Sequence, residues 1–207
     1  MKHQAVSIPV KDIAEIEIHM NKYPRQTLGA IMKKTGADYG INGTLYDMKT
    51  FQVLCHLRKD GYVYARPNYT VYGYGWNKGE DVEEVVLPNL ACSSYIACTP
   101  LIVKGQKKDK LIYNAAQGGK RGRSAIGMKT VNGERRFCLY CSKDGSGERR
   151  TPEQLRDLLY TYGWESATML DSGGSSQAVF ADGRKVITNR AVSHYLLIYM
   201  KKEKEHV

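Results

Sequence analysis

Leu170-Asp171-Ser172-Gly173-Gly174-Ser175-Ser176 is the stretch around which the chain is organised. It follows the short apolar segment Ser166 to Leu170, so Asp171 is expected where a buried strand ends. Paired glycines allow a positive φ and close approach of a ligand, and the adjoining N–H groups and serine hydroxyls can form a nest for an oxyanion. The alternative is an ordinary Gly-Ser turn, and the heptapeptide alone leaves both readings open.

The length and charge limit the range of functions. A chain of 207 residues can bury a sizeable core, and a single domain is the natural count. The formal net charge of +10 is clustered around residues 104–110, 120–123, 135–136 and 149–150. The positive electrostatic field of these clusters attracts phosphate-bearing substrates, nucleotides or acidic polymers. A solvated basic surface is the alternative for most of these lysines.

The cysteines and the N-terminus bear on the compartment. Five cysteines form an odd set without the spacing of a disulfide framework, which favours thiols in a cytoplasmic protein. Cys138 and Cys141 lie in one strand-like run, on opposite faces, so neither a redox motif nor a zinc knuckle is expected. The first residues lack a signal-peptide core, and no apolar run approaches the ~18 residues of a membrane span.

The periodicity predicts an α+β fold. Helices are expected near residues 24–35 and 151–162, the second opened by a capping box from Thr151 to Gln154. Strands fill most of the remainder, with tight turns at Asp60-Gly61 and Asn132-Gly133. We expect one domain with a mixed, strongly curved sheet. It would comprise an N-terminal strand and helix (1–36), a main part (37–200) and a charged tail (201–207).

Two further stretches carry candidate chemistry. Asn42-Gly43, followed by Tyr46 and Asp47, is either a tight hairpin turn or one wall of a cleft that Asn42 and Asp47 face. Arg123 is expected at the mouth of a strand. A guanidinium there can hold a phosphate through two parallel hydrogen bonds, although surface solvation is the usual state of a lone arginine.

These motifs together resemble those of the phosphodiester glycosidase family. The resemblance rests on Asn42-Gly43 with Tyr46-Asp47, Arg123-Ser-Ala-Ile-Gly127, the capped helix, the Asp171 loop and the closing Arg190, and spans roughly residues 37–200. Ser172 departs from the family pattern, which usually has a glycine there. His194 departs as well, since it stands near a position that is often asparagine.

The resemblance implies a hydrolase that cleaves a glycosidic bond to phosphate, in a sugar phosphodiester, a nucleotide sugar or a nucleotide-derived messenger of a bacterial or phage setting. Asp171 and Asp47 are the expected catalytic carboxylates. The other expected site residues contact substrate or phosphate: Asn42, Gly43, Arg123, Gly173, Gly174, Ser175, Ser176, Arg190 and His194.

Several alternatives stay open at this stage. No cofactor is required, but Asp171 offers hard oxygen ligands that suit Ca²⁺ or Mg²⁺. The expected partner is a small, anionic, phosphorylated substrate, and the same groups would also suit a binding protein that sequesters such a ligand without cleaving it. Nucleic acid is the least expected of these partners, because the sequence contains no recognised nucleic-acid-binding module. No membrane association is expected, and the sequence gives no oligomeric state.

Overall fold

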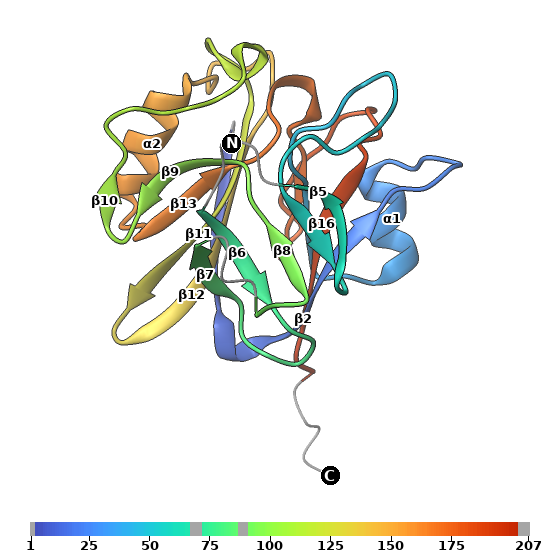
Figure 1. The fold of residues 1–207 in the computed structure, drawn as a ribbon, viewed down its shortest axis with the longest axis horizontal. Coiled ribbons are helices and arrows are strands. Elements are labelled where there is room, and N and C mark those ends of the chain that lie inside the picture. Colours follow the sequence, from blue (N-terminus) through green and yellow to red (C-terminus); the bar gives the residue numbers. More distant parts are fainter. Residues whose placement is uncertain (1–2, 67–71, 87–90, 203–207) are drawn as a thin grey trace.

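The computed structural model describes residues 3–66, 72–86 and 91–202, which form three β-sheets and two α-helices (Figure 1). The first sheet has the order β1 (His3–Pro9), β12 (Glu134–Ser142), β11 (Arg123–Val131), β13 (Ser166–Met169), β9 (Thr99–Val103) and β10 (Gln106–Lys107). The second has the order β15 (Lys185–Val186), β14 (Ala178–Val179), β3 (Tyr39–Asn42), β16 (His194–Met200) and β2 (Ile13–Met20). The third has the order β5 (Tyr62–Ala65), β4 (Leu57–Lys59), β8 (Ser94–Ile96), β6 (Tyr72–Trp76) and β7 (Glu83–Val86).

The single mixed sheet expected from the sequence is therefore wrong in detail. Every strand pairing within these three sheets is antiparallel. The fold is mostly β-sheet with two helices, so the α+β description fits only roughly. Strand runs alone do not reveal the split, because a change of sheet leaves the alternation of side chains along each strand unaltered.

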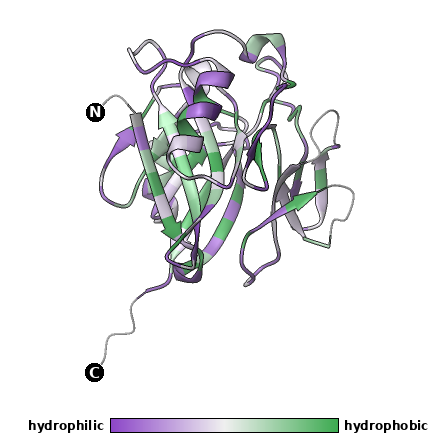
Figure 2. Ribbon diagram, turned by 90° about the vertical axis from the view of Figure 1, so that its left-hand side faces the viewer, coloured by the Kyte–Doolittle hydropathy of each residue, from purple (hydrophilic) through white to green (hydrophobic). Residues whose placement is uncertain are grey.

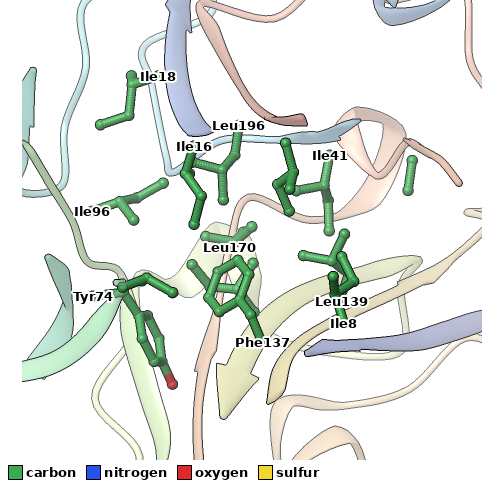
Figure 3. Packing of buried hydrophobic residues seen from close by; sticks show 14 of the residues in the cluster. Ile8, Ile16, Ile18, Ile41, Tyr74, Ile96, Phe137, Leu139, Leu170 and Leu196 are labelled. Carbon is green, nitrogen blue, oxygen red and sulfur yellow. The ribbon is translucent and has the colours of Figure 1, made fainter. Parts of the chain in front are cut away.

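The first two sheets share one core. Along β12, Phe137, Leu139 and Cys141 face this core, whereas Cys138 and Tyr140 face the opposite side, beneath helix α2 (Pro152–Thr161). The two cysteines thus lie on opposite faces, as the period of a strand requires. Figure 3 shows Ile8, Ile41 and Leu196 from three strands, and Leu170 just after β13, in this cluster with Phe137 and Leu139.

The outer face of the second sheet is covered by helix α1 (Leu28–Thr35). Tyr195 and Leu197 of β16 pack against Leu28 and Ile31 of this helix, while alternate residues of β16 enter the shared core. The two helices thus cover opposite faces of the paired sheets (Figure 1). Hydrophobic residues concentrate in the strands and hydrophilic ones in the surrounding loops (Figure 2). Among the described residues, no helix has both the length and the apolarity needed to cross a bilayer.

One helix begins as predicted and the other begins later. The capping box of α2 is present: the Gln154 N–H donates to Thr151 Oγ1 (3.2 Å), and the Thr151 N–H donates to Gln154 Oε1 (3.1 Å). Helix α1 begins at Leu28 rather than at residue 24. The Asn21 side chain accepts from the Gln26 N–H (3.0 Å) and donates to the Gln26 carbonyl (2.8 Å), which holds the preceding residues as a loop.

The tight turns are confirmed where two residues have positive φ. Asp60-Gly61 joins β4 to β5, and Asn132-Gly133 joins β11 to β12, each with both central φ angles between 49° and 83°. Such angles match the twist of the flanking strands. Asn42-Gly43 is different: Asn42 ends β3, which pairs with β14 and β16, so this stretch is not a hairpin turn.

Candidate active site

Asp171 lies just beyond the end of β13, where its main chain is held on two sides. Its N–H donates to the Gly43 carbonyl (3.1 Å), and its carbonyl accepts from Asn42 Nδ2 (3.0 Å). The preceding N–H, that of Leu170, donates to the Ser124 carbonyl (2.8 Å). The end of the first sheet is thereby joined to the second, and the Asp171 backbone is fixed before any ligand arrives.

Asn42 provides most of this connection. Its side chain is fully buried, and Oδ1 accepts from Ser124 Oγ (2.6 Å) and from the Gln177 N–H (3.1 Å). With Nδ2 donating to Asp171, the amide joins four segments of the chain. Its hydrogen-bonding capacity is almost used up by protein groups. The structure therefore places Asn42 behind the candidate site, in a supporting position.

The Asp171 carboxyl group is nearly enclosed, with 9% of the residue exposed. Burial raises its pKa to about 6, because the charged form loses hydration. The Ser175 hydroxyl, the Ser172 N–H (2.9 Å from Oδ1) and the charge of Arg190 all act in the opposite direction and favour the carboxylate. A carboxyl group whose pKa is shifted toward neutral pH in this way is typical of catalytic acids and bases.

Tyr46 extends this group by one more hydrogen bond. The Ser175 hydroxyl is hydrogen-bonded to both the Asp171 carboxyl group and the Tyr46 hydroxyl. The Ser175 contact lowers the pKa of both groups, since a hydroxyl that donates a hydrogen favours the ionised form of its partner. Ser175 thus connects Tyr46 and Asp171 in one chain of polar contacts. The sequence motif included Tyr46 only as an aromatic, and its role in this chain was not foreseen.

The glycine loop is partly occupied by the protein itself. Gly173 has φ 67°, which a glycine adopts readily, whereas Ser172 has φ −129°, which any residue adopts. Serine at this position, where the family pattern has glycine, therefore needs no special backbone. The Gly173 N–H donates to the Gly122 carbonyl (2.9 Å), and the Ser176 N–H donates to the Gly173 carbonyl (3.0 Å). Much of the predicted oxyanion nest is thus engaged in holding the loop.

The structure brings two exposed arginines to this loop: Arg121, whose Nη1 lies 3.9 Å from where a Cβ on Gly173 would sit, and Arg190. Arg190 is the closer one. It is exposed, and its guanidinium lies so close to Gly174 that a Cβ there would sit 2.9 Å from Cζ. The Arg190 backbone is fixed, since its N–H donates to Thr188 Oγ1 (3.1 Å) and its carbonyl accepts from Gln177 Nε2 (3.1 Å). The guanidinium itself contacts only the Met48 sulfur (3.6 Å) among the hydrogen-bond partners of the described residues.

Arg123 occupies the opposite environment. It is fully buried, and its guanidinium donates to the carbonyls of Arg150 (2.7 Å), Gln117 (2.7 Å) and Gly119. Burial lowers the pKa of this guanidinium to about 10. The predicted phosphate contact is not supported, because main-chain carbonyls already take the donors that a phosphate would need. Arg123 instead holds the loop of residues 117–119 against β11.

Asp47 is engaged in its own turn. Its Oδ1 accepts from the N–H groups of Lys49 and Thr50 (2.8 Å each), and these bonds, that of Thr50 first, lower its pKa. The arrangement is a local turn in which the side chain replaces a main-chain acceptor. The structure does not bring the Asp47 carboxylate into the group around Asp171, although the neighbouring Tyr46 belongs to that group.

Gly43 and His194 pack against each other beneath the site. A Cβ on Gly43 would collide with the His194 ring, so only glycine fits this approach. The His194 ring is buried, which lowers its pKa to about 3. Nε2 accepts from the Thr44 N–H (2.9 Å), so the neutral ring carries its proton on Nδ1, which donates to Ser193 Oγ (2.7 Å). This neutral ring is a support and presents no charge to a phosphate.

The described residues contain no group of three or more His, Cys, Asp or Glu side chains suited to holding a metal ion. A cavity of about 510 Å³ lies elsewhere, between β2 and the turn after β6, and none of the site residues lines it.

Ser176 Oγ and Gln177 Oε1 are buried without a hydrogen-bond partner. Gln177 was missed at the sequence level, because a glutamine after a Gly-Ser loop carries no distinctive signal.

Fold and site together define a mostly β-sheet protein with a buried carboxyl group and an exposed arginine at the end of one sheet. The phosphodiester glycosidase family matches residues 35–199. The chain therefore belongs to the phosphodiester glycosidase family.

Solved structures share the fold. The catalytic domain of zebrafish N-acetylglucosamine-1-phosphodiester alpha-N-acetylglucosaminidase, auto-inhibited by its pro-peptide, is 16% identical with a TM-score of 0.70, over 97% of this chain and 89% of that one. A hypothetical protein from Synechocystis is 12% identical with a TM-score of 0.72, over 96% of this chain and 59% of that one. Comparison with curated proteins finds no match.

Proposed function

We propose that the protein hydrolyses the bond between a sugar C1 and a phosphate oxygen, in a sugar phosphodiester or a nucleotide sugar. Asp171 is the catalytic carboxylate and Arg190 binds the phosphate. One observation carries this proposal. The buried carboxyl group of Asp171 precedes a loop on which the exposed Arg190 guanidinium lies, inside a segment that matches the family.

The chemistry of the leaving group fits a site with a single enclosed carboxylate. A phosphate leaves as a stable anion, so little protonation of the leaving oxygen is needed. The positive charge that develops at C1 requires a negative partner, which the ionised Asp171 supplies as nucleophile, base or electrostatic stabiliser. Arg190 neutralises the departing phosphate through charge-assisted hydrogen bonds.

The Tyr46–Ser175–Asp171 chain supports this role. Hydrogen bonds from Ser175 and from the Ser172 N–H hold the carboxylate in one orientation. Such preorganisation lowers the cost of reaching the transition state, because the groups need not rearrange as charge develops. Gln177 completes the arrangement by fixing both the Ser175 and the Arg190 carbonyls (3.4 and 3.1 Å).

The test is a hydrolysis assay on a panel of sugar-1-phosphodiesters and nucleotide sugars. The wild type is compared with Asp171→Asn and with Asp182→Asn, a matched control in an exposed turn where Arg184 Nε lies 2.7 Å from the carboxylate. We expect Asp182→Asn to retain activity and Asp171→Asn to lose at least about 100-fold. Activity should rise with pH through about 6, as Asp171 ionises.

Two results would contradict the proposal. If the wild type and Asp171→Asn were equally inert across the panel, the protein would not be this hydrolase. Calorimetry on the same ligands then decides between inertness and sequestration, since saturable binding with the ligand recovered intact indicates a binding protein. A pH profile unchanged by Asp171→Asn in an active enzyme would remove Asp171 from the chemistry.

A further inference from the structure

Two cysteine thiols lie together beneath the candidate site, a feature the proposed function does not use. Cys55 precedes β4, and Cys98 lies between β8 and β9. Their sulfur atoms are 3.5 Å apart, although 43 positions separate the residues, and both side chains are almost completely buried. Forming a disulfide requires the sulfur atoms to approach to about 2.05 Å. A closure of roughly 1.5 Å is within the range of side-chain rotation and small backbone shifts.

The two sulfurs have different environments. Cys98 Sγ accepts from Gln117 Nε2 (3.7 Å) and from the Leu45 main-chain N–H. Either thiol can donate the hydrogen of the sulfur–sulfur contact, and with the Cys98 hydrogen lost the Cys55 thiol becomes its donor. Two N–H donors therefore converge on one buried sulfur atom, and the Cys55 thiol can add a third once that sulfur is ionised. Donors of this kind stabilise a thiolate, which is the nucleophilic form of cysteine.

The other described cysteines provide an internal comparison. The hydrogen bond between Cys98 and Cys55 is the main cause that lowers the pKa of Cys98, against the opposing effects of burial and of the nearby Asp171 charge. Burial instead raises the pKa of Cys138 and of Cys141 to about 12 each, and it also raises that of Cys92. Cys98, Cys138 and Cys141 are equally buried, yet their pKa values shift in opposite directions. The difference lies in the donors around Cys98.

We propose that Cys98 and Cys55 form a peroxide-reactive dithiol, with Cys98 as the attacking sulfur and Cys55 as the resolving one. The Cys98 thiolate attacks one oxygen of hydrogen peroxide, the O–O bond breaks, and the departing hydroxide takes up a proton to leave as water. Cys55 then attacks the Cys98 sulfenic acid, the S–O bond breaks, and a second water leaves with the thiol proton. Both sulfurs are oxidised to one disulfide and one peroxide is reduced. Peroxide is nearly as small as water, so transient local opening admits it.

The disulfide would connect the two walls of the candidate site. Leu45, which donates to Cys98, precedes Tyr46, and the Leu54 N–H before Cys55 donates to the Leu45 carbonyl (2.8 Å). On the other side, Gln117 Nε2 also donates to the Leu170 carbonyl (3.4 Å), directly before Asp171. Forming the Cys55–Cys98 disulfide would therefore alter the hydrogen bonds of Leu45 and Gln117, which hold the main chain next to Tyr46 and Asp171. The inference does not depend on the proposed function, because the crosslink is measured directly.

The experiment is a peroxide titration of the folded full-length chain. After quenching, the protein is denatured, alkylated and analysed by peptide mass spectrometry. We expect a Cys55–Cys98 crosslink, reversed by dithiothreitol, at peroxide concentrations that leave Cys138 and Cys141 fully alkylated. In urea this selectivity should disappear, because unfolding disperses the donors around Cys98. Cys141→Ser serves as the matched control and should form the crosslink as readily as the wild type.

Two outcomes would overturn the proposal. One is that Cys98 in the folded protein is alkylated as completely as Cys141 at every peroxide concentration. The other is that Cys98 becomes sulfinic acid while Cys55 stays alkylated, which would show that no resolving step occurs. In Cys55→Ser, by contrast, oxidation of Cys98 to sulfinic acid without any crosslink is the expected result, because the serine hydroxyl can still donate to Cys98 but cannot resolve a sulfenic acid.

Discussion

Replacing Asp171 by asparagine should stabilise the folded protein at neutral pH while it removes activity. An aspartate in the unfolded chain has a pKa near 3.8, and burial raises the folded value to about 6. Since the folded state holds the proton more tightly, the stabilising contribution of this group is complete below about 3.8 and is lost as the pH rises through about 6. The lost contribution corresponds to roughly 2.2 pKa units, or about 3 kcal/mol.

Asparagine has almost the same shape and carries no charge, so it avoids this cost at any pH. The free energy of unfolding of Asp171→Asn minus that of the wild type should therefore increase by up to about 3 kcal/mol between pH 4 and pH 8. Urea unfolding at a series of pH values measures this difference directly. Only the difference between the two free energies of unfolding is informative, because His194 also contributes to the pH dependence of both proteins. Its buried ring has a pKa of about 3, so it lowers their stability as the pH falls below 6.5, whereas Asp171 raises that of the wild type.

Asp182→Asn is the control, because the exposed Asp182 carboxylate is bonded to Arg184 and its pKa is lowered. Its difference curve should be small and of opposite sign. If the Asp171→Asn curve were flat with pH, the carboxyl group would not be paying a desolvation cost in the folded state. The proposal of a site prepared by burial would then lose its physical basis, whatever the activity of the variant.

Three further changes separate supporting residues from ligand-binding ones. Arg123→Gln leaves buried carbonyls without donors, so urea unfolding should show a loss of at least about 3 kcal/mol. Arg190→Gln removes an exposed cation, so steady-state kinetics should show the KM for an anionic substrate raised about tenfold or more, with the unfolding midpoint unchanged. Gly43→Ala forces a methyl group into the buried His194 ring and should cost about 1–3 kcal/mol of stability, measured by the same urea unfolding.

Local signals predicted local structure well. The capping box at Thr151 and the turns at Asp60-Gly61 and Asn132-Gly133 depend on contacts within a few residues, so the sequence contains all that is needed. The start of α1 and the division into three sheets depend on partners far along the chain. Asn21 donates to the Val192 carbonyl (2.8 Å) as well as bonding to Gln26, and no periodicity within residues 21–36 reports such a contact.

The candidate site shows the same limit in its chemistry. Sequence patterns placed Asp171, Asn42, His194 and the glycine loop together, and the structure brings them within one hydrogen-bonded layer. They did not show which side chains point outward. Asn42 and His194 look like ligand contacts in the sequence, yet both are buried and bonded to the protein.

The two arginines make the point most clearly, since both were expected at strand ends with the same role. Arg123 is enclosed by carbonyls that its own loop supplies, while Arg190 stays exposed above Gly174. The case for a phosphate ligand therefore rests mainly on the Arg190 guanidinium near the Asp171 carboxyl group, with Arg121 on the Gly173 side of the loop, and the net charge of +10 adds little to it. The Arg190 guanidinium alone matches the single negative charge of a phosphodiester, so substrates with further phosphates should gain affinity only if Arg121 or another basic side chain reaches them.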